Sequence, residues 1–265
     1  MKHYPTYRAA RLLLTAVLLF AVPAVGEDIH VMTSGAFTAA YKELVPLYEQ
    51  KTHDTIVSAY GASMGNAPDS IPTRLDRGEP ADVVILAASA LDQLIEKRQV
   101  FDGSRVDLVR SAIGIAVPHG APKPDISTVE GLKQALLHAK SVAYSASASG
   151  VYVSTELFPR LGIAEQMAGK ARRTTSQDGT GPEAARGEVD IAIQQISELL
   201  PVKGIDYVGP LPAEVQRITI FSAGIATGAK NPQGAKALIQ FLSSAEAVPA
   251  IKESGLEPVS RGLGH

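Results

Sequence analysis

The chain has 265 residues, of which 45% are hydrophobic and 20% charged, a balance that excludes a disordered or collagen-like protein. Its formal net charge of −2 provides no basic field for nucleic acid, so no nucleic-acid partner is expected. The chain has no cysteine and no tryptophan, which excludes disulfide scaffolds, thiolate metal sites and cysteine nucleophiles and argues against a stacking platform for bases or sugars.

The first 26 residues have the layout of a secretory signal peptide. Three cations, Lys2, Arg8 and Arg11, precede an uncharged run over 12–22, and small residues follow at 23–26. The run is shorter than the ~20 residues that span a bilayer; a membrane anchor or a buried helix is the alternative. Removal of this segment leaves 22 basic and 27 acidic residues, a net charge of −5. We therefore expect a periplasmic protein that holds any anionic ligand with local groups.

Strands and helices are predicted to alternate along the rest of the chain. Strands are expected at 28–33, 55–60, 82–87, 113–117, 141–145, 171–176, 189–193 and 217–225. Helices are expected at 37–50, 70–77, 89–97, 127–139, 150–161, 183–186 and 232–243. This alternation predicts an α/β fold with parallel or mixed sheets.

Two α/β blocks separated near residue 110 predict two lobes with a ligand cleft between them. We assign 1–26 to the signal peptide, 27–108 to lobe 1, 109–224 to lobe 2 and 225–265 to C-terminal helices that return to lobe 1. The linkers are expected near 105–110 and 222–228. Nothing in the sequence indicates oligomerisation, so a monomer is expected.

Small polar residues follow several of the predicted strands, where open α/β sheets bind ligands. Serine hydroxyls and backbone N–H groups at helix N-termini suit an anion, and glycine lets the backbone approach it. Any one serine could be a plain helix cap, but the pattern recurs in both lobes. The candidate binding residues are Ser34, Gly35, Ser63, Met64, Ser147, Ser149, Gln194 and Gln195.

Two further side chains are candidates for chemistry. Arg74 lies one turn into a predicted helix and could bind a carboxylate with two hydrogen bonds, or could pair with Asp76 or Glu79. Tyr152 follows the serine-rich turn and could donate to a ligand oxygen, or could be a core tyrosine. The histidines show no metal-binding spacing and no nucleotide-binding loop is present, so no metal and no organic cofactor is expected.

Segments 33–37, 75–84 and 186–192 resemble the periplasmic molybdate-binding proteins, and the likeness extends from about Ile29 to the C-terminus. The resemblance implies a two-lobed type II periplasmic binding fold with two hinge crossings and a central cleft for an anion. It maps the oxyanion-holding serines of that family onto Ser34 and Ser63, and the contacts of the second lobe near 147–149 and Gln194.

The chain also departs from that family. Gln194 and Gln195 stand where molybdate binders have a tyrosine, and the turn over 61–68 is longer. A planar carboxylate suits amide donors and Arg74 better than molybdate does. The stretches 143–152 and 194–201 resemble a separate branch that includes the aconitate isomerases, which interconvert trans- and cis-aconitate on a binding-protein scaffold.

Two functional classes follow from the resemblance. The first is a cofactor-independent isomerase of a small polycarboxylate, in which the serines and Arg74 hold carboxylates and Tyr152 moves the proton. The second is a solute-binding subunit that delivers a carboxylate or an oxyanion to an ABC permease, with the same cleft and no base. A fold alone does not decide between them.

Overall fold

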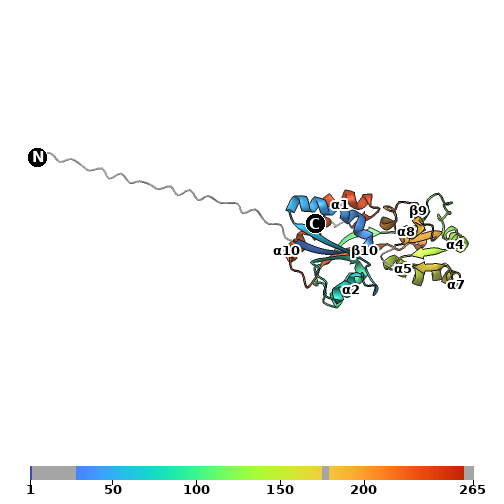
Figure 1. Cartoon of the computed structure of the whole chain (residues 1–265), viewed down its shortest axis with the longest axis horizontal. Helices are drawn as coiled ribbons and strands as arrows, with labels where there is room; N and C mark the ends of the chain where they lie inside the picture. Colours follow the sequence, from blue (N-terminus) through green and yellow to red (C-terminus); the bar gives the residue numbers. More distant parts are fainter. Residues whose placement is uncertain (2–27, 175–178, 260–265) are drawn as a thin grey trace.

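The computed structural model describes Met1, residues 28–174 and residues 179–259, which form two α/β bodies lying side by side (Figure 1). The predicted signal peptide, apart from Met1, and the end of the strand predicted at 171–176 lie outside the described residues. Among the residues described, no helix is long and apolar enough to cross a membrane.

Lobe 1 is built on a six-stranded mixed sheet in the order β11-β4-β10-β3-β1-β2. Its strands are β1 (Asp28–Ser34), β2 (Thr55–Gly61), β3 (Val83–Ala87), β4 (Val106–Ser111), β10 (Thr219–Ile225) and β11 (Glu257–Pro258). The first three run parallel, whereas β10 is antiparallel to both of its neighbours. The carboxyl ends of β1, β2 and β3 therefore meet at one edge, where small polar residues had been predicted to lie.

Helices cover both faces of this sheet. One face packs against α1 (Gly35–Thr52), α10 (Pro232–Leu242) and α11 (Val248–Glu253), and the other against α2 (Ile71–Asp76) and α3 (Ala88–Glu96). The sequence of β3 is continuously apolar because both faces of the strand are buried. Val83 and Ile85 belong to the core beneath α1, α10 and α11, while Val84 and Leu86 belong to the core beneath α2 and α3.

Lobe 2 has a five-stranded mixed sheet in the order β7-β6-β8-β5-β9. Its strands are β5 (Ile113–Pro118), β6 (Val142–Tyr144), β7 (Ala171–Arg173), β8 (Ile191–Gln195) and β9 (Ile205–Pro210). One face packs against α4 (Val129–His138), α5 (Ala148–Tyr152), a π-helical turn (Val153–Leu157), α6 (Phe158–Arg160) and α7 (Ala164–Ala168). The other face packs against α8 (Thr180–Ala185) and α9 (Ile196–Leu199). Short 3-10 turns occur at Ala213–Val215 and Ala245–Ala247.

The two-lobed α/β architecture is confirmed, but the strands place the crossings differently from the prediction. The chain passes from lobe 1 to lobe 2 between β4 and β5, at 111–113, and returns between β9 and β10, at 211–218. The predicted boundaries at 108/109 and 224/225 therefore fall inside β4 and β10, which both belong to the sheet of lobe 1. The segment predicted as a linker at 105–110 is largely strand β4, and β9 was not predicted.

Local capping explains where two helices begin. Ser70 precedes α2, and its hydroxyl accepts a hydrogen bond from Thr73 N at 3.4 Å. In α4 the cap is Thr128, whose hydroxyl accepts a hydrogen bond from Gly131 N at 3.0 Å. The C-terminal helices return to lobe 1, because Leu238 of α10 and Ile251 of α11 are buried in its core.

One buried carboxylate stabilises lobe 1 through backbone contacts. Asp82 is 1% exposed, and its two oxygens accept hydrogen bonds from His30 N at 2.7 Å, Lys230 N at 2.6 Å and Asn231 N at 2.9 Å. Burial alone would raise the pKa of Asp82, but these amides hold it below its ordinary value. The side chain thus joins β1 to the segment that leads into α10.

We expect Asp82→Asn to destabilise the protein by about 3 kcal/mol, because an amide NH₂ would face backbone donors that a carboxylate oxygen now accepts. Chemical denaturation at neutral pH measures this loss. Asp92→Asn is the matched control, since Asp92 is half exposed and forms a surface ion pair with Arg105. Equal losses in the two variants would contradict the structural role given to Asp82.

Candidate functional site

A cavity of about 420 Å³ lies between the two lobes. Most of the residues that line it have polar side chains, and many of them lie at the ends of strands or the starts of helices in the two lobes. Lobe 1 contributes residues 34–36, 38, 42, 60–63, 69, 74 and 221, and lobe 2 contributes residues 145–149, 174, 179, 194, 195 and 198. The structure therefore brings together Ser34, Gly35, Ser63, Arg74, Ser147, Ser149, Gln194 and Gln195, eight of the ten predicted site residues.

Ser34 stands at the N-terminus of the 18-residue helix α1 without capping it. Its side chain makes no capping bond to the helix, and its hydroxyl oxygen is buried with no hydrogen-bond partner among the described residues. A buried hydroxyl without a partner is costly, so a ligand is its natural partner. Its hydroxyl lies beside the N–H groups of the first turn of α1, which have no partner within the helix, an arrangement that suits an anion.

The other predicted serines lie on the seam between the lobes. Ser63 N donates to Ser147 Oγ at 3.2 Å, and Ser63 Oγ accepts from Ala87 N at 3.0 Å, which leaves the hydroxyl proton of Ser63 for a ligand. The hydroxyls of Ser145 and Ser149 lie 2.9 Å apart. The turn that presents them needs Gly150, because a Cβ there would lie 1.6 Å from the carbonyl oxygen of Ser145.

The two glutamines at the end of β8 have different surroundings. Gln194 accepts a hydrogen bond from the hydroxyl of Thr180 and donates from Nε2 to Glu198 Oε2 at 2.6 Å. Gln195 accepts from Ser111 Oγ at 2.8 Å and donates to Thr219 Oγ1 at 3.3 Å. Gln194 therefore orients a cavity group, whereas Gln195 joins lobe 2 to both strands that lead to the crossings.

Arg74 lines the cavity but is already engaged with lobe 1. It pairs with Glu79, and its Nε donates to the carbonyl of Asp69 at 3.1 Å. The alternative of an ion pair with Glu79 is therefore the one the structure shows. Arg74 nevertheless lines the cavity and contributes positive charge to its wall.

Two predicted residues are not among those that line the cavity. Tyr152 is 3% exposed in the core of lobe 2, and its hydroxyl donates to the carbonyl of Val215 at 2.5 Å. It lies at the end of α5 on the face that packs against the sheet, so the proton-transfer role predicted for it has no support in this geometry. Met64 packs against the two cores of lobe 1 instead.

A carboxyl group that sequence reasoning did not single out lies in the cavity. Glu198, in α9, reaches across the seam to the start of α1: a Cβ added at Gly35 would lie 2.2 Å from Glu198 Oε2. Burial raises the pKa of Glu198 to about 7, while the hydrogen bond from Gln194 acts in the opposite direction. The available signal was an acidic residue in the first turn of a helix directly after a strand that ends at the predicted site.

The cavity has charged residues of both signs. Lys42 and Arg74 are basic, and Asp69 and Glu198 are acidic. Lys42 and Tyr60 are exposed, with Lys42 Nζ 5.3 Å from the centre of the Tyr60 ring. In the described parts of the chain, no group of three histidine, aspartate or glutamate side chains could hold a metal ion.

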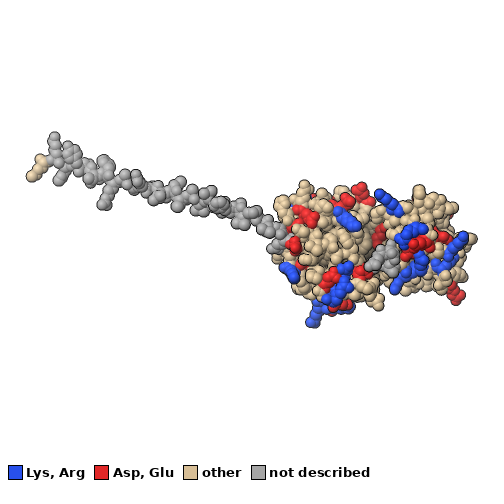
Figure 2. Space-filling model, viewed as in Figure 1, with Lys and Arg blue, Asp and Glu red and all other residues tan. Residues whose placement is uncertain are grey.

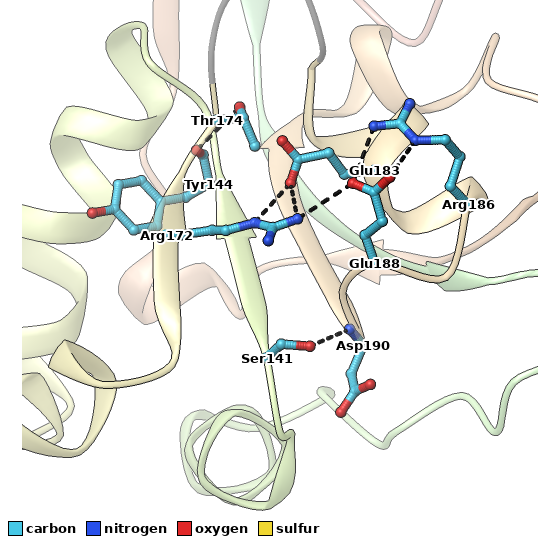
Figure 3. Close-up of polar contacts among 8 residues, drawn as sticks. All are labelled: Ser141, Tyr144, Arg172, Thr174, Glu183, Arg186, Glu188 and Asp190. Carbon is cyan, nitrogen blue, oxygen red and sulfur yellow. Dashed lines mark hydrogen bonds and ion pairs between the residues drawn. The ribbon is translucent and has the colours of Figure 1, made fainter.

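A network of ion pairs links α8 and the turn after it to strand β7 of lobe 2. Arg172 of β7 points toward the carboxylates of Glu183 and Glu188, and Arg186 meets Glu188 from the other side (Figure 3). The ion-pair distances are 2.7 Å for Arg172–Glu183, 3.5 Å for Arg172–Glu188 and 2.6 Å for Arg186–Glu188. On the face seen in Figure 2, basic side chains gather over the second lobe with acidic ones between them. The Arg172–Glu183 pair steadies the helix that carries Thr180, the partner of Gln194.

The family model for bacterial extracellular solute-binding proteins matches residues 29–257. The chain belongs to this family. It is 45% identical over 255 residues to an aconitate isomerase of Pseudomonas sp., covering 96% of this chain and 97% of that protein. It is 25% identical over 258 residues to a molybdate-binding protein of Rhodobacter capsulatus, covering 96% and 98%.

Solved structures of periplasmic binding proteins share the fold. The periplasmic molybdate-binding protein of Azotobacter vinelandii matches with a TM-score of 0.71 at 17% identity, covering 88% of this chain and all of that one. The predicted resemblance to the molybdate-binding proteins and to the isomerase branch is thus confirmed. The cavity combines neutral donors with four charged side chains, of which the carboxyl of Glu198 is the one with a raised pKa.

Proposed function

We propose that the protein is an isomerase that interconverts trans- and cis-aconitate by moving an allylic proton. The 45% identity to an aconitate isomerase, over nearly the full length of both chains, supports this assignment. The cavity volume of about 420 Å³ falls within the ~300–1,000 Å³ usual for small-molecule sites. Its hydroxyls, the N-terminus of α1 and the two cations Lys42 and Arg74 suit a ligand with several carboxylates.

The carboxyl of Glu198 is the observation that carries the proposal. A site that only binds an anion gains nothing from an acidic group in its wall, because the ionised group repels the ligand. A proton transfer at carbon needs such a group, and its efficiency is greatest when the pKa lies near the working pH. Glu198 meets that condition, with a pKa raised to about 7.

The family description also bears on where the protein works. Membership of an extracellular family, together with the signal-like segment of the sequence, supports a periplasmic location. The substrate would then be a small anion captured as the two lobes close over it, which also excludes water from the reaction. The proposed reaction requires no cofactor, since a proton is all that moves.

A solute-binding subunit is the second candidate, favoured by the description of the family and by the molybdate-binding relative. In that role the protein would release an unchanged carboxylate or oxyanion to an ABC permease. Both functions use the same cavity and the same closure of the lobes. They differ in whether the bound anion is changed.

We expect the purified protein to convert trans-aconitate to cis-aconitate at a rate proportional to its concentration, and to reach the same final ratio from either isomer. Proton NMR follows both isomers at once, and citrate in the same spectrum would reveal a contaminating hydratase. Tight binding of trans-aconitate or of molybdate without any conversion would refute the isomerase and favour the carrier.

A further inference from the structure

Glu198 is placed where one side chain can reach a ligand held by both lobes. It belongs to α9 of lobe 2, and its carboxyl lies against Gly35 of lobe 1 at the N-terminus of α1. A hydrogen bond between neighbouring residues holds the two segments together. Ser197, which precedes Glu198, donates from Oγ to the carbonyl oxygen of Ala36, which follows Gly35, at 2.7 Å. An anion bound at the first turn of α1 would therefore lie beside the carboxyl group.

The carboxyl is held from one side only. Gln194 Nε2 donates to Oε2 at 2.6 Å, and Gln194 is fixed in turn by the buried hydroxyl of Thr180. Within residues 28–174 and 179–259, Oε1 of Glu198 accepts no hydrogen bond and the carboxyl makes no ion pair. One oxygen is thus oriented by the protein, and the other remains for a proton.

The other titratable groups that line the cavity are placed differently. Lys42 and Tyr60 are exposed and lie close to each other. Asp69 is on the loop before α2, and its carbonyl accepts from Arg74. Glu198 is the one whose ionisation burial strongly disfavours, so it exists in both protonation states near neutral pH.

We propose that Glu198 is the catalytic acid and base of the isomerisation, and that the same carboxyl group takes the proton from one carbon and returns it to another. This inference rests on the proposed function. Gly35 leaves space for the carboxyl, and Gln194 with Thr180 acts as a positioning pair.

The proposed step balances without any other reactant. The carboxylate of Glu198 takes a proton from the methylene carbon of trans-aconitate, and the electron pair of that C–H bond forms a new double bond to the central carbon. The original double bond opens, and its electrons bind the proton that Glu198 gives back at the former vinylic carbon. The new double bond forms between the former methylene carbon and the central carbon, so the conformation about that bond, which is single in the bound substrate, sets the cis geometry. The carboxylate is regenerated and nothing is oxidised or reduced.

The test compares the wild-type protein with Glu198→Gln and Glu198→Asp. In D₂O we expect Glu198→Gln to lose roughly 100-fold or more in turnover and in deuterium exchange into the substrate. Its Kd for trans-aconitate, measured by calorimetry, should stay within a few-fold of wild type. Glu198→Asp should retain part of the activity, because it keeps a carboxyl one methylene shorter. Glu165→Gln, an exposed glutamate of lobe 2, is the matched control and should behave as wild type.

The outcomes separate this inference from the function on which it rests. If the wild-type protein shows no conversion, the proposed function fails and the inference fails with it. If the wild type converts its substrate and Glu198→Gln keeps more than a tenth of that turnover, the function stands and the role of Glu198 is wrong. If Asp69→Asn lost activity while Glu198→Gln kept it, the catalytic base would be Asp69 and not Glu198. Near-wild-type circular dichroism of each variant ensures that lost activity is not lost folding.

Discussion

Gly35→Ala is expected to lower turnover about 100-fold while leaving the fold intact. A Cβ at this position would lie 2.2 Å from Oε2 and 2.8 Å from Cδ of Glu198, both at the far end of a flexible side chain. The carboxyl would move aside, and a displacement of about 1 Å at a reacting group costs on the order of 100-fold in rate. Stability should change by less than about 1 kcal/mol, because alanine suits the first turn of a helix.

This result is measured as kcat by NMR and as stability by chemical denaturation, with Gly169→Ala as the control. Gly169 has a negative φ and nothing within 4 Å of an added Cβ, so the same chemical change there should be silent. If Gly35→Ala lost substrate affinity but kept kcat, its role would lie in anion binding at α1. Unchanged kinetics would show that catalysis does not depend on the present position of the Glu198 carboxyl.

Much of the fold was predictable because its strands carry strong local signals. The apolar run of β3 and the helical spacing of α1 are satisfied by the cores that these elements join. Strand β4 was predicted as a linker, and its pairing with β10 and β11 makes it a strand of lobe 1. Strand β10 was predicted as a strand of lobe 2, but it joins the sheet of lobe 1, so the second boundary was misplaced as well.

The site was predictable where it depends on local backbone and unpredictable where it depends on packing between lobes. Ser34, Ser63 and Ser147 follow strands, so their positions at the cavity could be inferred from the alternation of elements. Tyr152 lies only three residues after Ser149, but its side chain is packed in the core of lobe 2 and does not line the cavity. The carboxyl of Glu198 lies against Gly35, which is distant from it in sequence, and no periodic pattern of residues reveals such a contact.

Glu198 also ties the stability of the protein to pH. Burial raises its pKa to about 7 in the folded protein, against about 4.5 for an ordinary glutamate. Between these values the folded state binds more protons than the unfolded state, so the contribution of Glu198 to stability falls as pH rises from 4.5 to 7 and is constant above. The neutral partner Gln194 faces the group from β8, Lys42 is on α1, and Asp69 and Arg74 complete the charged lining of the cavity.

Glu198→Gln is therefore expected to be more stable than the wild type by up to about 3 kcal/mol at pH 8, and nearly equal to it at pH 4.5. Chemical denaturation of both proteins between pH 4.5 and 8 measures the difference, in which the other titrating groups cancel. Glu165→Gln should show no such trend, because Glu165 is exposed. A difference that stays constant across this range would mean that Glu198 titrates like an ordinary glutamate. In that case the carboxyl would be fully ionised at neutral pH, and its suitability for moving a proton both ways would be lost.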